Sequence, residues 1–439
     1  MSQFFYNNFR RYFVYTQWRE RRFTTAGKFA VLAMIVSAIL GVNTRQALAY
    51  QVFGLLLALL CAAMIFGRRF GGRVNIVRTL PRYATVGEEV SYRLRVSNAD
   101  VQPVQGLSLL EVHHDPRPDF RQFMQARDPG AARRNRYDNM VGYYRWTWLV
   151  RMNQVAHFDE IAVPVLPAGA SVDLTHRFTP AHRGTLSLRG VALARRDALG
   201  LCRAVHELDL PGSVMVLPRT YRLPSVHLPG QRHYQPEHRI NASASGDGEE
   251  ISGLREYRLG DALRDIHWKS FARTGTPMVK EYQAEFFERH ALLLDTMGAP
   301  DGDAFEEAVS LAASFVGDVK EGDCLLDLLF VGAECYCFTM GPGELQAEAL
   351  MRVLAGVRPC PDQSLRALHA TVLSRRTELS GCICILLAWD AERRQMLEEF
   401  QQLGLPVLVL LVSAAAAADC PAWIRVLKPG QIEAGLAES

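Results

Sequence analysis

The chain has 439 residues, 49% of them hydrophobic, and a formal net charge of +3 at pH 7. This length allows two or three domains of ordinary size. A net charge so close to zero, without a polybasic tail, argues against a bulk electrostatic binder of nucleic acid. The nine cysteines form no CxxC pair, which predicts reduced cysteines in a packed core.

The N-terminal region predicts a membrane anchor. In residues 1–27, aromatic side chains alternate with arginines, as in a segment that lies at a membrane interface. Residues 28–66 hold two apolar runs, KFAVLAMIVSAILGV and ALAYQVFGLLLALLCAAMIF, separated by NTRQ. The second run reaches the roughly 20 residues that cross a bilayer, and the first does so with its flanks. We expect two transmembrane helices; a buried soluble hairpin and a signal sequence are the alternatives.

Charge gives the orientation of this hairpin. Six basic residues precede it, four follow it, and the connecting loop holds only Arg45. The positive-inside rule then places both termini and all later domains in the cytoplasm of a two-pass inner-membrane protein.

Residues 74–218 predict a β-sandwich, immunoglobulin-like in type. The run EVSYRLRVS alternates apolar and polar side chains, and further short strands recur between Gly, Pro and Asn. The polar, Arg-rich segment 113–140 reads as a long loop or an insertion.

Residues 219–245 have the composition of a linker, being rich in Pro, His, Ser and Asn. From 286 to 439, buried strands such as HALLLDT, CLLDLLFV, CICILLAW and PVLVLLVS alternate with amphipathic helices. This alternation predicts a doubly wound α/β domain, with CLLDLLFV and CYCFTM as an antiparallel edge hairpin.

Residues 246–285 are the most distinctive stretch. They hold eight acidic and six basic residues among aromatics, so a nucleic-acid grip is disfavoured. Asp261 stands where a helix N-cap would, before ALRDIHWKSFAR. The balance of charge predicts a network of Arg–carboxylate pairs with Trp268 as its hydrophobic anchor. Such a network can brace two domains or form the docking face for a partner, and the residues leave both readings open.

Catalytic motifs are absent from the sequence. It contains no P-loop, no HExxH, no GxSxG, no GxGxxG before a helix and no zinc-type Cys/His spacing. No cofactor is predicted.

The string LREYRLGDALRDIHWKSFAR resembles the signature of the bacterial family called domain of unknown function 58. The resemblance extends to the apolar hairpin, to the RGxxxL and DALGL elements between Arg183 and Leu201, and to the α/β region. It implies a membrane-anchored relative of von Willebrand factor A domains that works with an AAA+ ATPase of the MoxR type. A transglutaminase-like membrane protein is a second implied partner. The motif residues that would shape or present the docking face are Arg255, Glu256, Tyr257, Gly260, Asp261, Arg264, Trp268 and Arg273.

The comparison with A domains also raises a possible metal site. Their metal-binding DxSxS motif corresponds here to DTMGA, so both serine positions are lost, to Met297 and Ala299. Asp295 and Asp390 each follow a strand of the α/β domain and are expected near one edge of the sheet. Together they could hold Mg²⁺ weakly, although capping of the following helices is the favoured role.

Three functional hypotheses follow from these observations. The first is a non-catalytic scaffold that engages the ATPase through the motif. The second is a divalent-metal-dependent hydrolytic enzyme that uses Asp295 and Asp390, and the third is an assembly platform for other membrane proteins.

Overall fold

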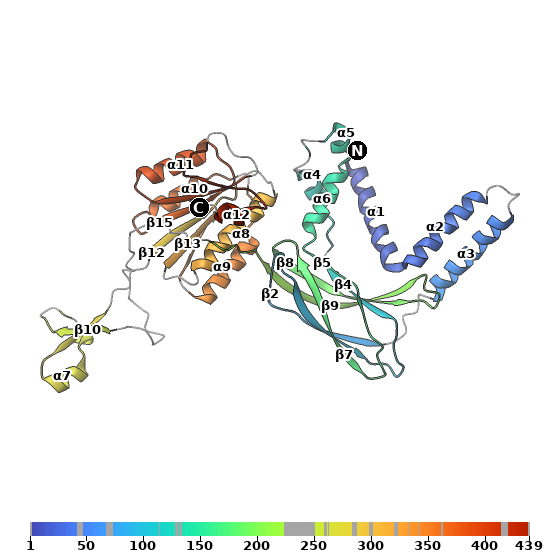
Figure 1. Cartoon of the computed structure of the whole chain (residues 1–439), viewed down its shortest axis with the longest axis horizontal. Helices are drawn as coiled ribbons and strands as arrows, with labels where there is room; N and C mark the ends of the chain where they lie inside the picture. Colours follow the sequence, from blue (N-terminus) through green and yellow to red (C-terminus); the bar gives the residue numbers. More distant parts are fainter. Residues whose placement is uncertain are drawn as a thin grey trace. The chain divides into compact units, whose positions relative to one another are not determined.

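The computed structural model describes residues 2–41, 47–66, 73–113, 115–126, 128, 131, 134–223, 251–258, 261, 263–282, 288–297, 302–319, 324–332, 334–341, 343–360, 363–413 and 420–437 (Figure 1). The chain divides into two compact units. The first comprises residues 1–219 with 351–357, and the second comprises 220–350 with 358–439. The predicted linker lies almost entirely outside the described residues.

Three helices open the first unit: α1 (Ser2–Arg22), α2 (Thr25–Leu40) and α3 (Ala47–Phe66). Among the described residues, α3 is the one helix long and apolar enough to cross a membrane, with a mean hydropathy of 2.3 over Leu48–Ile65. The shorter α2 is also apolar and packs against α3 (Figure 1). Large apolar side chains of both helices are exposed.

The segment 113–140, predicted as a long loop or an insertion, contains helices rather than one long loop. It contains α4 (Phe120–Gln125) and α5 (Arg136–Val141), which are followed by α6 (Tyr143–Asn153). Aromatic residues spaced along these short helices pack around Tyr6 of α1, whose ring lies 5.6 Å from that of Phe123 and 5.5 Å from that of Trp146. The local polarity of the segment could not reveal this cluster, because its partner lies more than a hundred residues away.

Two β-sheets enclose the core of the first unit. One has the order β1-β3-β7-β5, with β1 Val74–Thr79, β3 Val90–Asn98, β7 Ser171–Pro180 and β5 Ala156–Phe158. The other has the order β2-β9-β8-β4-β6, with β2 Tyr83–Thr85, β9 Arg203–Leu217, β8 Gly184–Arg196, β4 Leu107–His113 and β6 Ile161–Ala162. The alternation predicted for β3 is confirmed, because Tyr92, Leu94 and Val96 are buried. Residues of both sheets form one hydrophobic cluster.

The corner between α1 and α2 is fixed to the turn between β8 and β9. Thr24, the N-cap of α2, donates its backbone N–H to the Leu201 carbonyl at 3.1 Å and its hydroxyl to the Gly200 carbonyl at 2.6 Å. A Cβ atom at Gly27 would lie 2.0 Å from the same Leu201 oxygen, so only glycine allows this close approach.

The second unit contains a mostly parallel sheet with the order β14-β13-β12-β15-β16-β17. Its strands are β12 Glu288–Leu294, β13 Cys324–Val331, β14 Cys335–Met340, β15 Gly381–Leu386, β16 Val407–Val412 and β17 Arg425–Leu427. The antiparallel β13–β14 edge hairpin is confirmed. The sequence did not indicate β17, which is short.

Helices cover both faces of this sheet (Figure 1). They are α8 Gly302–Val319, α9 Glu344–Gly356, α10 Arg366–Ser374, α11 Ala391–Gln402 and α12 Ile432–Ala437. Alternate strand residues, among them Leu293 and Cys384, pack against Leu368 of α10 and Phe400 of α11. The buried stripe of α8 contacts β12, β13, β15 and β16. All nine cysteines are free.

Candidate functional site

The LREY motif lies in a segment of the second unit, residues 251–282, that contains β10, α7 and β11 and is called the motif unit below (Figure 1). Strands β10 (Ile251–Glu256) and β11 (Met278–Tyr282) pair antiparallel, with Arg255 opposite Val279. Between them the chain forms a 3₁₀ turn at Leu263–Asp265 and the helix α7 at Trp268–Thr274. Ile266 bridges to Val279, and these two buried side chains form the small interior of the unit.

Asp261 organises the charged side of this motif unit. Its carboxylate accepts two hydrogen bonds from the Arg255 guanidinium, at 2.7 and 2.8 Å, and a third from the Arg258 backbone N–H at 2.8 Å. The paired Arg255 guanidinium, followed by the Arg258 N–H, lowers the pKa of Asp261 to about 2. The predicted Arg–carboxylate pairing is therefore present at Arg255 and Asp261.

One detail of the motif prediction is wrong. Asp261 is not the N-cap of α7, because the intervening residues form a 3₁₀ turn and His267 precedes the helix. Trp268, the predicted hydrophobic anchor of the network, has 60% of its surface exposed.

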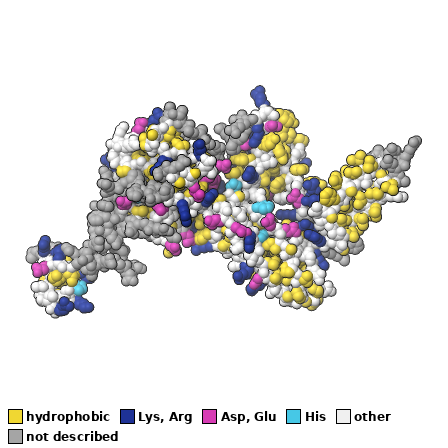
Figure 2. Space-filling view, in the orientation of Figure 1, with side chains coloured by type: hydrophobic (Ala, Val, Ile, Leu, Met, Phe, Trp, Pro, Cys, Tyr) yellow, Lys and Arg dark blue, Asp and Glu magenta, His cyan; other side chains and the backbone are white. Residues whose placement is uncertain are grey.

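The exposed face of the unit is apolar and basic. Leu263 is 66% exposed, and Trp268 stands next to the exposed Phe271 with their ring centroids 6.0 Å apart. Lys269 and Arg273 are also exposed on α7. Figure 2 shows hydrophobic and basic side chains side by side on this unit. We call Leu263, Trp268 and Phe271 the apolar face of the motif unit.

The other predicted motif residues have less distinctive positions. Glu256 is exposed at the end of β10, and the Tyr257 N–H donates to the Pro277 carbonyl at 2.9 Å. Arg264 lies in the 3₁₀ turn. Gly260 lies outside the described residues.

The two candidate metal ligands, Asp295 and Asp390, are bound by one arginine. The Arg393 guanidinium donates its Nε to Asp295 Oδ2 at 2.8 Å and also pairs with the Asp390 carboxylate. Asp295 is fully buried and also accepts the backbone N–H groups of Met297 and Leu387. Asp390 caps α11 by accepting the Arg393 N–H at 3.0 Å, which confirms its predicted capping role.

This arrangement places a fixed cation where a metal would otherwise be needed. A guanidinium balances the two carboxylates and supplies directed hydrogen bonds to both. Thr296 donates its hydroxyl to the Val331 carbonyl at 2.6 Å, while Gly298 and Ala299 lie outside the described residues. Within the described part of the chain, no cluster of three or more His, Cys, Asp or Glu side chains could hold a metal. The donor set therefore does not fit a divalent cation.

The site residues predicted from the sequence did not include Arg393, although the sequence contains a signal for it. An arginine three residues after an N-cap aspartate lies beside that aspartate on the first turn of a helix. Its second partner, Asp295, is 98 residues away and can be found only from the fold.

Two further buried charge networks were also missed. Arg289 of β12 pairs with the fully buried Asp327 of β13, which also accepts the Thr339 hydroxyl at 2.6 Å. In the first unit, Arg78 donates to the buried Glu111 at 2.6 Å. Burial raises the pKa of Glu111. The sequence contains a signal for Glu111. It follows Leu107 and Leu109 at alternate positions of β4, so it lies on the same buried face of the strand as the two leucines.

Comparison with known proteins matches part of the chain to a family model. Residues 253–394 match the family model described as "Protein of unknown function DUF58". That range includes the motif unit from its third residue onward, together with Asp295, Asp390 and Arg393.

A curated relative is the "Uncharacterized protein YeaD" of Bacillus subtilis, which is 26% identical over 192 residues. The match covers 42% of this chain and 46% of the relative, so the chain spans about half the length of that protein. A solved structure, the CARDB domain of a Pyrococcus furiosus protein, aligns with 33% of this chain and 93% of its own at 11% identity and a TM-score of 0.16. The chain carries a domain of the DUF58 family at residues 253–394.

Proposed function

We propose that the protein is a membrane-anchored, non-catalytic scaffold whose motif unit docks another protein. By family resemblance, that partner is an AAA+ ATPase of the MoxR type. One observation carries the docking role. The Arg255 and Asp261 side chains pair with each other within the motif unit, whereas Leu263, Trp268 and Phe271 are exposed.

The composition of the apolar face suits protein recognition. Aromatic residues and arginine are the residue types that contribute most of the binding energy at protein interfaces, and here exposed aromatic residues have an arginine as a neighbour. Lys269 and Arg273 would favour a partner with an acidic rim around an apolar groove. A brace would require another part of this chain to cover the same face.

The pairing of Arg393 with both carboxylates favours the scaffold hypothesis rather than the hydrolytic-enzyme hypothesis. A metal-dependent hydrolase must keep an open coordination position for water or substrate. The Asp295 carboxylate is fully buried and accepts protein donors at both oxygens, so coordination would require removing Arg393.

The placement in the membrane belongs to the same proposal. α2 and α3 form a two-pass anchor in the inner membrane, with both termini on the cytoplasmic side. The exposed apolar side chains of the two helices and the arginines around them support this topology. We further propose that the first unit is an immunoglobulin-like sandwich and that the α/β region is a divergent A-type domain.

The docking role can be tested by crosslinked affinity capture from native membranes, read by mass spectrometry. Trp268→Ala is the test variant, and Trp423→Ala is its matched control, because Trp423 is 42% exposed but lies outside the motif unit. We expect Trp268→Ala to reduce captured ATPase by about thirtyfold, since an interface aromatic contributes roughly 2 kcal/mol. Trp423→Ala and wild type should capture equally.

Thermal melts of the purified variants separate docking from bracing. If Trp268→Ala lowers the melting temperature as well as capture, the apolar face packs within the chain and is a brace. Equal capture by both variants contradicts the docking role. Recovery of a Trp268-dependent membrane complex that contains no ATPase would instead support the assembly platform.

A further inference from the structure

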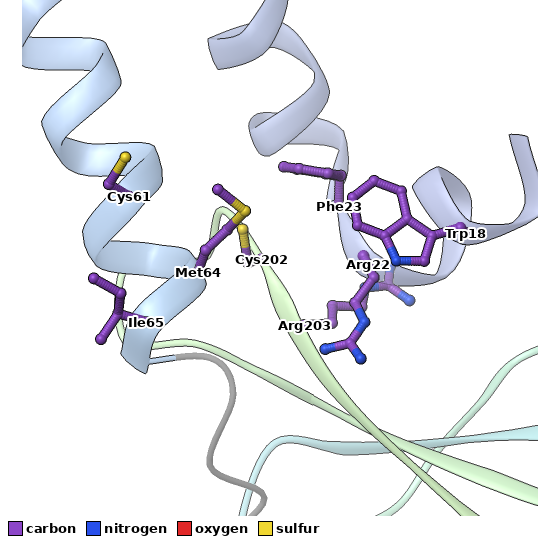
Figure 3. Close-up of a pocket in the computed structure, with 8 residues that line it drawn as sticks. All are labelled: Trp18, Arg22, Phe23, Cys61, Met64, Ile65, Cys202 and Arg203. Atoms are coloured by element: carbon purple, nitrogen blue, oxygen red, sulfur yellow. The ribbon is translucent and has the colours of Figure 1, made fainter. Parts of the chain in front are cut away.

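The junction of α1, α3 and β9 holds a cavity of about 320 Å³ (Figure 3). Helix α1 contributes Trp18 and Arg22, and the end of α3 contributes Cys61, Met64 and Ile65. The start of β9 adds Arg203, next to Cys202, and Phe23 completes the lining. This volume is within the range of small-molecule sites, about 300–1,000 Å³.

The lining divides into an apolar wall and a cationic edge. Figure 3 shows Met64 and Ile65 on the α3 side and the guanidinium groups of Arg22 and Arg203 together on the opposite side. Met64 and Ile65 are 45% and 66% exposed, so the apolar wall continues directly into the exposed apolar surface of α3. A ligand with a charged group joined to a hydrocarbon chain matches this division.

Arg22 is the cation available to such a ligand. Its neighbour Arg21 is paired with Glu207 at 2.9 Å, and Arg203 is held by Glu160 at 2.9 and 2.7 Å. No ion pair joins Arg22 to an acidic side chain in the part of the chain that the structure describes. A second cavity along α1 and β9 is also lined by Trp18 and Arg22, so these two side chains border both cavities.

The position of the cavity selects the class of ligand. α2 begins and α3 ends beside the cavity, so both helices of the proposed anchor leave the bilayer there. Tryptophan and arginine are the side chains that favour the lipid headgroup region. We propose that this cavity binds an anionic phospholipid, with its phosphate on the guanidinium of Arg22 and its acyl chain along Met64 and Ile65. The proposal rests on the membrane anchoring proposed above.

The test is native mass spectrometry of the full chain after reconstitution in vesicles of equal parts phosphatidylglycerol and phosphatidylcholine. Arg22→Gln is compared with Arg19→Gln, which removes the same charge from an exposed position on the same helix outside the cavity. We expect wild type and Arg19→Gln to retain phosphatidylglycerol preferentially. Arg22→Gln should retain at least about tenfold less phosphatidylglycerol, which corresponds to the loss of one charge-assisted hydrogen bond.

A second variant tests the apolar wall without changing charge. Cys61→Phe places a larger side chain in the cavity from an exposed position and should also reduce the retained lipid. Equal losses in Arg19→Gln and Arg22→Gln would overturn the proposal in favour of diffuse electrostatic attraction. Displacement of the lipid by millimolar inorganic phosphate, with the same dependence on Arg22, would overturn it in favour of a free-anion site.

Flotation of the same vesicles distinguishes failure of the proposed membrane anchoring from failure of the proposed lipid site. Protein that does not float with the vesicles contradicts the proposed anchoring. Protein that floats but retains both lipids equally overturns only the lipid site.

Discussion

Arg393 joins two carboxylates that the sequence supplies almost a hundred residues apart. Its side chain is 5% exposed and that of Asp295 is fully buried, so each charge depends on the other for compensation. The Asp390 carboxylate is half exposed and serves mainly as the N-cap of α11. The free energy of this small cluster should therefore depend far more on Asp295 than on Asp390.

Replacing Arg393 with methionine should destabilise the α/β region strongly. The change leaves a buried carboxylate without its cation, which costs about 3–5 kcal/mol. The measurement is hydrogen exchange of β12 and α11, read by mass spectrometry on the full chain. Asp390→Asn keeps a capping side chain and should cost about 1 kcal/mol or less. Equal protection in wild type and Arg393→Met would refute the compensating role of the guanidinium.

Asp261 should titrate far into the acid range. Its pKa is lowered to about 2, against about 3.9 for an unperturbed aspartate. A pKa depressed on folding stabilises the folded motif unit above pH 4, and the contribution is lost as the pH falls through 2. Carboxyl ¹³C NMR of the protein labelled at aspartate would measure the midpoint. Arg255→Gln should shift it upward towards 4, and a wild-type midpoint near 4 would contradict the pairing.

At the scale of elements, α2 is connected to the β-sheets of the first unit through a tight corner. Thr24 caps α2 and bonds to the β8–β9 turn, and Phe23 forms an isolated bridge with Cys202. Gly27 permits the approach because it has no side chain. The turn that α2 meets contains the DALGL element, Asp197–Leu201, that contributed to the family resemblance.

Gly27→Ala should loosen this corner. The added Cβ would meet the Leu201 carbonyl at 2.0 Å, and backbone atoms must shift to admit it, at a cost of about 1–3 kcal/mol. Faster hydrogen exchange at residues 197–202 is the expected signal. Gly54→Ala is the control, because a Cβ there would meet no atom within 4 Å and alanine favours the helix. Similar exchange in both variants would rule out the close approach.

At the scale of the whole molecule, the two helices α2 and α3 differ in their capacity to span a bilayer. With 20 residues, α3 is about 30 Å long, whereas the 16 residues of α2 give about 24 Å. The hydrocarbon core is about 30 Å thick, so α2 needs its flanking residues or local thinning of the bilayer. In the proposed topology, the Arg-rich end of α1 and the arginines after α3 hold these flanks at the membrane interface.

The proposed topology predicts that the protein stays in the membrane pellet after alkaline carbonate extraction. A variant that lacks residues 25–66 should be released. Epitope tags at the two termini should be cleaved by added protease in inverted vesicles and protected in right-side-out vesicles. Release of the wild-type chain would contradict integral anchoring, and cleavage of only one tag in inverted vesicles would contradict the two-pass topology.

The sequence by itself determined the local patterns: the apolar α3, the alternating β3, the order of strands and helices in the α/β region, and the family motif. These patterns depend on neighbouring residues, whose periodicity fixes which face of an element is buried. Only the tertiary structure decided which distant groups meet. It placed Arg393 between Asp295 and Asp390, packed α4 and α6 around Tyr6, and left Trp268 exposed, because burial and pairing depend on which elements the fold brings together.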